Sequence, residues 1–427
     1  MAPLEPWEKV LVSSESYMGS IHGTIACTTC HLGENAAEKE AAHTGLISRP
    51  SEDPGKVCGT CHADIAEVYP DSLHASQAGY WTTIDARNAP EDHPALEEMF
   101  GNHCASCHTS CGDCHVSQPQ SVGGGLIDGH NFNATPSLTR NCTACHGSRV
   151  GNEYMGKHED IKADVHFRQG RMKCTDCHTA AEMHGDYANI EGFTTDSPMN
   201  RYEGGQLPEC TQCHTSVGSA DEGIQMHQTH GDKLSCQVCH SVSYSSCDGC
   251  HVQTSEDTGN PYFATEGTYL TFFIGKNPIK SDERPYEYVT LRHIPVSPTS
   301  YSFYTGAEMA NYDALPTWSY ATPHNIQRET PQNASCEACH GNQQIFLTAD
   351  KVAEGELTAN QSVIVEKVPA PVGEMTSEIE PMPENHAGLA AGICLNCHAE
   401  GGEDIPKIPE GHAEYDPEGC LTCHTTP

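Results

Sequence analysis

The sequence is poor in basic residues and contains no long apolar run. Only 22 of its 427 residues are lysine or arginine, against 58 aspartates and glutamates, so the formal net charge is −36. Nucleic acid and anionic lipid repel such a chain, and we expect neither as a partner. A membrane-spanning helix needs about 18 or more consecutive apolar residues. No such stretch occurs, so we expect no membrane span.

The chain is also short of material for an apolar interior. Hydrophobic residues make up 37% of it, and that share already includes 24 cysteines. Side chains alone would make a thin core for a chain of this length. Another component is therefore needed to fill the interior.

Cysteine is abundant, and it occurs in one fixed pattern. All 24 cysteines fall into twelve C-x-x-C-H motifs, with none left over. The first cysteines are Cys27, Cys58, Cys104, Cys111, Cys142, Cys174, Cys210, Cys236, Cys247, Cys336, Cys394 and Cys420. The second cysteines are Cys30, Cys61, Cys107, Cys114, Cys145, Cys177, Cys213, Cys239, Cys250, Cys339, Cys397 and Cys423, and the histidines after them are His31, His62, His108, His115, His146, His178, His214, His240, His251, His340, His398 and His424.

This spacing has a chemical reason. Two thiols three positions apart reach the two vinyl groups of one haem, and the histidine that follows then faces the iron. A disulfide scaffold would also use an even number of cysteines, but it needs no histidine after each pair. Zinc is an alternative where Cys104, Cys107, Cys111 and Cys114 lie close together, yet both of those pairs are also followed by histidine. The motifs predict twelve covalently bound haems c.

The histidines outside the motifs are candidates for the second axial ligand of each iron. There are 27 histidines in all, so fifteen lie outside the motifs. A histidine follows the motif histidine by twelve positions at His43, His74 and His158, and precedes a motif by eight at His166, His386 and His412. Fixed offsets indicate reused modules, without saying which iron each histidine binds. The predicted distal ligands are His22, His43, His74, His103, His130, His158, His166, His184, His227, His230, His293, His324, His386 and His412, whereas His93 is as well explained by solvation.

Two protein ligands on each iron would decide the kind of activity. Methionine could replace histidine and raise the potential, but surplus histidine favours bis-histidine coordination and low potentials. An iron with both axial positions filled has no open site for a substrate. We therefore expect an electron carrier with no catalytic residues, although reductase activity is not excluded.

The density of motifs divides the chain into four segments. Residues 1–80 hold two motifs, 81–260 hold seven, 261–335 hold none, and 336–427 hold three together with a proline-rich arm. We expect mostly coil with short α-helices around a covalent haem array. In the aromatic-rich insert, YLTFF at 269–273 and YEYVTLRH at 286–293 predict short strands of a small β element, which would cover the array or, alternatively, form a substrate pocket.

Several segments resemble known proteins. CGDCHVS from Cys111, NCTACHGSRVGNEY from Asn141 and KCTDCHTAAEMHG from Lys173 resemble multihaem c-type cytochromes of extracellular electron transfer, including cytochromes that form filaments called nanowires. Some enzymes of this broad group have a C-x-x-C-K motif, whereas all twelve motifs here end in histidine. The resemblance implies anaerobic respiration, with other redox proteins or extracellular acceptors as partners, and a homopolymer with haem-to-haem subunit contacts.

Haem attachment also has a bearing on location. It requires export, yet the first residues, MAPLEPWEKV, lack the basic flank and apolar stretch of a secretory leader. We infer that a leader has been removed and expect an extracellular or cell-surface protein rather than a periplasmic one. The alternatives are a multihaem reductase of a nitrogen or sulfur oxyanion and a monomeric periplasmic electron shuttle.

Overall fold

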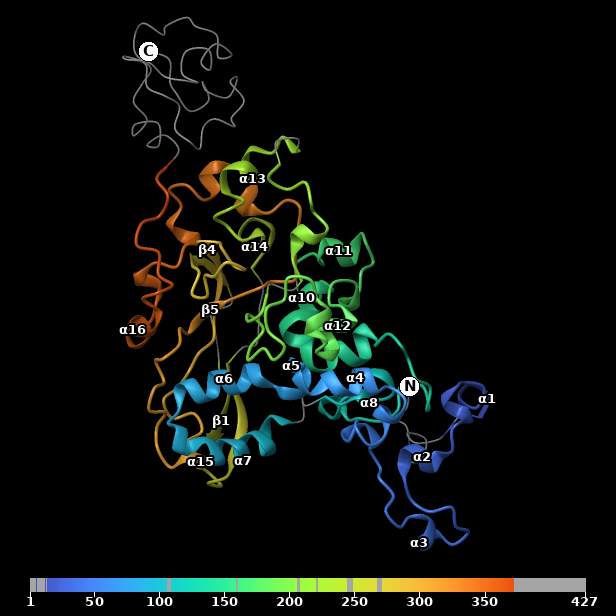
Figure 1. Cartoon of the computed structure of the whole chain (residues 1–427). Helices are drawn as coiled ribbons and strands as arrows, with labels where there is room; N and C mark the ends of the chain where they lie inside the picture. The colour runs from blue at the N-terminus through green and yellow to red at the C-terminus, as the bar shows by residue number, and fades with distance from the viewer. Residues whose placement is uncertain are drawn as a thin grey trace, which may run out of the picture.

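The computed structural model describes residues 5, 12, 14–105, 109–158, 160–205, 208–219, 222–243, 249–266 and 271–371 (Figure 1). Several predicted site residues lie outside this part of the chain. They are Cys107, His108, Cys247, His386, Cys394, Cys397, His398, His412, Cys420, Cys423 and His424, together with the side chain of Cys250.

Helices are short and separated by coil, as the sequence predicts. Among the helices of the described residues, only α6 and α7 run beyond two turns. The helices are α1 (Ser14–Tyr17), α2 (Cys27–His31), α3 (Lys39–Ala42), α4 (Ala63–Val68), α5 (Leu73–Ser76), α6 (Ala78–Arg87), α7 (His93–His103), α8 (Cys111–His115), α9 (Thr143–His146), α10 (Asn152–Tyr154), α11 (Val165–Arg168), α12 (Ala180–His184), α13 (Gln225–His230), α14 (Cys236–His240), α15 (Ser302–Thr305) and α16 (Leu357–Asn360). No helix within the described residues is long and apolar enough to cross a membrane.

Most of the described motifs form a single helical turn. Three coincide with α-helices, namely α2, α8 and α14, and four begin with a 3₁₀ turn, over Cys58–Thr60, Cys174–Asp176, Cys210–Gln212 and Cys336–Ala338. At Cys142 a π-helical turn, Leu138–Cys142, leads into α9. In such a turn, positions i, i+3 and i+4 lie on one face. Both cysteines and the histidine of a motif are thereby presented on the same side.

Within the described residues, the β structure consists of two antiparallel sheets. Strand β1 (Gly249–Thr254) pairs with β2 (Pro261–Glu266), with Val252 opposite Phe263. Strand β4 (Tyr288–His293) lies between β3 (Phe272–Lys276) and β5 (Trp318–Tyr320). The predicted small β element is confirmed, and its first strand begins inside the ninth motif rather than after it.

The described apolar residues gather in three places. The largest cluster, which we call the sheet core, contains Val289, Leu291, Trp318, Tyr320, Leu347, Val352, Val363 and Ile364. A second cluster joins α6 and α7 to β1, where Met99 and Leu96 cover Val252. A third connects Val238 of α14 with Ile274 of β3. Each cluster involves the strands or helices α6 and α7, whereas the motif-bearing helices α2, α8 and α9 contribute no residue to any of the three.

The motif-bearing elements follow one another across the molecule (Figure 1). Helix α2 lies near the N-terminal end, α8 and α12 lie further in, and α14 and α13 lie at the opposite end. Helices α6, α7 and α15, with β1, form a group beside this succession, and α15 contacts both α7 and β1. The fold therefore arranges the motifs along the length of the molecule.

Candidate functional site

Eight motif histidines each face one histidine from elsewhere in the chain. These are the histidines of all eight motifs that the structure describes completely. The ring centroids are 6.0 Å apart for His31 and His130, 6.2 Å for His62 and His22, 6.1 Å for His115 and His184, 6.1 Å for His146 and His74, 6.4 Å for His178 and His324, 6.1 Å for His214 and His166, 6.0 Å for His240 and His227, and 6.1 Å for His340 and His230.

The narrow range of these distances has a chemical meaning. Direct ring packing would produce varied separations and angles. A metal bonded to both imidazoles adds about 2 Å on each side, and each bonding nitrogen lies about 1 Å from its own ring centroid, so the centroids should be about 6 Å apart. All eight pairs therefore have the separation that two axial ligands of one metal require.

The pairs do not follow the sequence offsets. His74 follows His62 by twelve positions but faces His146. His166 precedes Cys174 by eight positions but faces His214. His22 faces His62 of the next motif along the chain. These three segments each supply a histidine to a motif other than the nearest one, which connects distant parts of the chain.

Protonation in the unloaded chain also suits metal binding. Burial lowers the pKa of His324 to about 4, and the opposite His178 lowers it further. The same two causes, burial first and the facing imidazole second, lower the pKa values of His22, His130, His184 and His230. A metal binds the neutral imidazole. These five distal histidines are held in the form that can bind.

Hydrogen bonds orient several of the motif rings. Four of them donate from Nδ1 to a main-chain oxygen: His31 to Ile47 at 3.0 Å, His115 to Asn133 at 2.7 Å, His240 to Gln327 at 3.0 Å and His340 to Ala370 at 3.2 Å. A carbonyl oxygen only accepts, so Nδ1 must carry the proton. That leaves Nε2 with its lone pair free to bind a metal.

The first cysteines of different motifs meet in pairs. The thiol of Cys111 lowers the pKa of Cys58, and the thiols of Cys174 and Cys210 lower those of Cys142 and Cys236 in the same way, so the two thiols of each pair lie close together. None of these six cysteines is in a disulfide. The first cysteines of neighbouring motifs therefore lie side by side as free thiols.

The second cysteines connect the remaining neighbours. Burial raises the pKa of the Cys30 thiol, and the nearby thiols of Cys58 and Cys61 raise it further. Similar electrostatic coupling joins Cys114 with Cys145, Cys177 with Cys213, and Cys239 with Cys339. Taken together, these contacts order the motifs as a single row that starts at Cys27 and continues through Cys58, Cys111, Cys142, Cys174, Cys210, Cys236 and Cys336.

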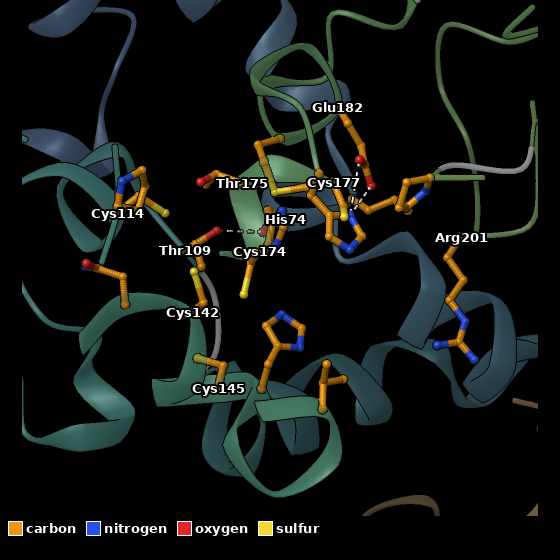
Figure 2. Close-up of a pocket in the computed structure, with 18 of the residues that line it drawn as sticks. His74, Thr109, Cys114, Cys142, Cys145, Cys174, Thr175, Cys177, Glu182 and Arg201 are labelled. Carbon is orange, nitrogen blue, oxygen red and sulfur yellow. Dashed lines mark hydrogen bonds and ion pairs between the residues drawn. The ribbon is translucent and has the colours of Figure 1, made fainter. Parts of the chain in front are cut away.

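One continuous cavity of about 4160 Å³ follows most of this row. All the completely described motifs except the one at Cys336 line it, as do Cys104 and His251. A pocket for one small ligand measures about 300–1,000 Å³. In Figure 2, Cys142 and Cys174 approach each other from separate elements at this cavity. Its volume, thiols and paired imidazoles fit several covalently attached haems.

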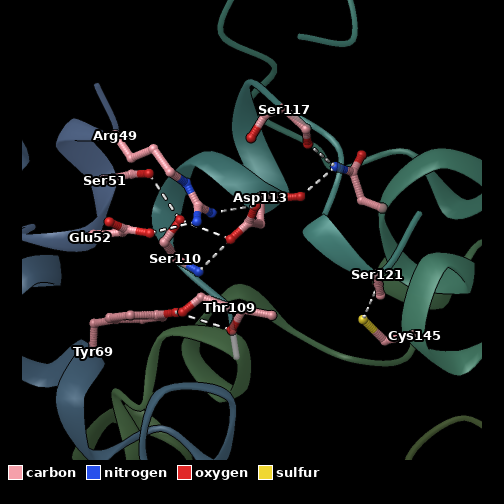
Figure 3. Close-up of polar contacts among 11 residues, drawn as sticks. Arg49, Ser51, Glu52, Tyr69, Thr109, Ser110, Asp113, Ser117, Ser121 and Cys145 are labelled. Atoms are coloured by element: carbon pink, nitrogen blue, oxygen red, sulfur yellow. Dashed lines mark hydrogen bonds and ion pairs between the residues drawn. The ribbon is translucent and has the colours of Figure 1, made fainter. Parts of the chain in front are cut away.

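A buried polar network fixes the motif at Cys111 against its neighbours (Figure 3). Asp113 accepts hydrogen bonds from the main-chain nitrogen and hydroxyl of Ser110, each at 2.9 Å, and Arg49 lies 3.7 Å from its carboxylate. The amide of Asn141, beside Cys142, donates to the main-chain oxygen of Asp113 at 2.6 Å and to that of Ser117 at 3.0 Å. Three segments are thus locked together around one motif.

The other predicted distal histidines have different surroundings. His293 is 6% exposed, donates to the Glu356 carboxylate at 3.0 Å and packs against Trp318 in the sheet core. His103 forms a 2.7 Å hydrogen bond with the Tyr304 hydroxyl. His43 lines the cavity, and His158 lies half-buried beyond α10. The structure therefore puts His293 and His103 next to partners that are not motif histidines.

Sequence reasoning did not identify the residues that surround the ligands. Glu182, Asp164 and Glu222 each accept a hydrogen bond from the Nδ1 of a paired histidine. A signal was available for Glu182, because it follows His178 by four positions and such residues meet on a helical turn. Asp164 and Glu222 precede their histidines by two and five positions, spacings that carry no comparable signal.

Residues 57–147 match the family model of cytochrome c554 and c-prime. The matched segment covers about a fifth of the chain and contains the motifs at Cys58, Cys104, Cys111 and Cys142. No curated protein and no solved structure is detectably similar to the chain. The match supports a c-type cytochrome, which carries haem c and exchanges electrons with redox partners.

Proposed function

We propose that this chain is a dodecahaem c-type cytochrome that conducts electrons along a row of covalently bound haems. The observation that carries the proposal is the set of eight imidazole pairs, each with centroids 6.0–6.4 Å apart and each containing one motif histidine. Bound haem supplies a one-electron iron couple at each pair. The proposed axial ligands are the motif histidine and the histidine that faces it.

The protein's own contribution is spacing and coordination. Pairs of motifs share a thiol–thiol contact at Cys58 and Cys111 and again at two further places along the row. These contacts keep successive sites close together, which rapid electron transfer between them requires. Two histidines at each site fill both axial positions and exclude a substrate from the metal. The arrangement favours conduction over a reductase reaction.

The first experiment is a count of haems and a measurement of their spin state. Intact-mass spectrometry of the native protein should show twelve haem additions, and the ferric protein should have only low-spin electron paramagnetic resonance (EPR) signals. Fewer than twelve additions would contradict the dodecahaem count, and fewer than eight would also contradict the row, because eight sites have both ligands in place. A high-spin signal together with turnover of nitrite, hydroxylamine or tetrathionate would instead support a reductase.

We also propose that the protein acts outside the cell or at its surface, in respiration, and assembles end to end with further copies. One end of the row, at Cys27, lies beside apolar side chains that solvent reaches, with Met18 57% and Ile21 83% exposed. A contact between unlike ends that does not close gives a filament. Such a contact would cover these side chains and bring redox sites of two copies together.

Electron cryo-microscopy of protein released from cells tests the assembly separately. Filaments in which α1 and α2 contact the next copy would support it. Discrete particles whose sedimentation matches one chain would reject the filament and favour a monomeric shuttle, while leaving the haem row itself intact.

A further inference from the structure

Three neighbouring sites in the row differ from the others in the acceptor of the Nδ1 hydrogen bond. At the Cys174 site, His178 donates to Glu182, with the oxygens at 3.0 and 3.2 Å. At the Cys210 site, the distal His166 donates to Asp164 at 2.9 Å. At the Cys236 site, the distal His227 donates to Glu222 at 2.9 Å. Each of these acceptors is a carboxylate.

Four motif histidines of the row have neutral acceptors, and one of them is His240 of the Cys236 site, which donates Nδ1 to the main-chain oxygen of Gln327 at 3.0 Å. His31, His115 and His340 donate Nδ1 to main-chain oxygens at 3.0, 2.7 and 3.2 Å. A carboxylate draws the Nδ1 proton more strongly than a carbonyl does and makes Nε2 a stronger electron donor. A stronger donor stabilises ferric over ferrous iron. It therefore lowers the reduction potential of the haem that it binds.

The three carboxylates are largely shielded from solvent, so water does not screen out their effect on the reduction potentials. The side chains of Asp164, Glu222 and Glu182 are 3%, 14% and 20% exposed. At the Cys174 site a second carboxylate adds to the effect, since Glu153 is buried 3.9 Å from the Nδ1 atom of His324. Arg201 opposes it there, because its positive charge acts on His324 from within the same cavity (Figure 2). With two carboxylates and one guanidinium, the net charge around the imidazole pair of the Cys174 site is negative.

We propose that Glu182, Asp164 and Glu222 are positioning residues that make the Cys174, Cys210 and Cys236 haems a block of low reduction potential at three consecutive sites of the row. This inference rests on the proposed function. Each site gains or loses one electron, and the Nδ1 proton stays on the imidazole in both states. On reduction, these three sites fill last.

The cleanest variant is Glu182→Gln. Glutamine has the same shape and its Oε1 still accepts from Nδ1, so only the charge is removed. Glu222→Gln is a second, independent variant at another site. The matched control is Glu209→Gln, because Glu209 lies beside Cys210 and acts on its thiol electrostatically but bonds to Thr211 instead of an imidazole. Spectroelectrochemical titration of the holoprotein gives the midpoint potentials.

Each of the two variants should raise the ferrous-to-ferric ratio of one haem about tenfold at a fixed potential, equal to an upward shift of about 59 mV for one electron. Glu209→Gln, the control, should shift the midpoint potentials by less than this. Equal shifts in variant and control, or none in either, would overturn the inference.

A measurement on the native protein covers the case in which a variant fails to assemble. Three haems should titrate below the remainder, and a single unresolved wave would contradict the block. Absence of bound haem would instead contradict the proposed function. Failure of the low-potential block and failure of the proposed function are therefore distinguishable.

Discussion

The sheet core and the motif-bearing segments are built in opposite ways. In the sheet core, Val289, Leu291, Trp318, Leu347 and Val363 are completely buried. In the segments from α1 to α4, by contrast, Ile21, Leu46 and Ile65 are at least 40% exposed, and a continuous cavity takes the place of a core. The sheet core has its own apolar interior, whereas the motif-bearing segments lack one. A cofactor must supply the packing there, as metals or disulfides do in small domains.

Preventing haem attachment should have the largest effect and separate the two regions most clearly. Protein made without the attachment machinery should lose amide protection in α2, α8, α9 and α12, because the paired imidazoles then have nothing between them and these helices belong to no core cluster. Strands β3, β4 and β5 should keep part of their protection. Hydrogen exchange measured by mass spectrometry on the apo and holo forms is the test. Equal protection in both forms would mean that the motif-bearing segments fold without haem.

Truncation of one core side chain should affect only the sheet. Leu291 is fully buried between β3 and β5, so Leu291→Ala should lower the free energy of opening the sheet by about 3 kcal/mol. The matched control is Leu46→Ala at a site that is 44% exposed, where about 0.5 kcal/mol or less is expected. Native-state hydrogen exchange of the β4 amides measures both. A loss of haem absorbance in Leu291→Ala would show that the regions are coupled.

Two buried histidines provide a sharper comparison of the regions. His324→Ala should turn one haem high-spin, because His324 faces His178 across the space for a metal. His293→Ala should leave the haem spectrum unchanged and weaken the sheet by about 1–3 kcal/mol, since the Glu356 carboxylate would lose its hydrogen-bond donor. Optical and EPR spectra separate these outcomes. A high-spin signal from His293→Ala would place that residue among the iron ligands.

The sequence predicts what is local and misses what is distant. A C-x-x-C-H motif is local, because one helical turn brings its three side chains to one face, as at Cys111 in α8. The alternation in YEYVTLRH likewise predicts β4, in which Val289 and Leu291 share the buried face. Strand β5 was not predicted, because its three residues, Trp318–Tyr320, are too few for a periodic pattern.

The pairing of histidines shows why the remainder of the site could not be predicted. His324 faces His178 only because the chain returns from β5 past α10, where Glu153 accepts a hydrogen bond from the main-chain nitrogen of His324 at 3.0 Å. The spacing of histidines in the sequence does not predict that path of the chain. The repeated offset of twelve from His62 to His74 is real, but it does not correspond to a shared metal, since His74 faces His146.

The smallest expected effect concerns the angle between facing imidazole rings. The planes of His74 and His146 are 89° apart, whereas those of His178 and His324 are 22° apart. Parallel rings both donate into the same iron d orbital and split it from its partner, whereas perpendicular rings donate equally to both. The Cys142 haem should therefore give a highly anisotropic low-spin EPR signal and the Cys174 haem a rhombic one.

His74→Ala and His324→Ala would assign these two signals, because each removes one of them. Loss of the rhombic signal in His74→Ala would contradict the pairing itself. Unchanged signals in both variants would mean that neither histidine binds iron. Of the four tests this one changes the molecule least, yet it reports directly on how the interlocked segments orient the ligands of the row.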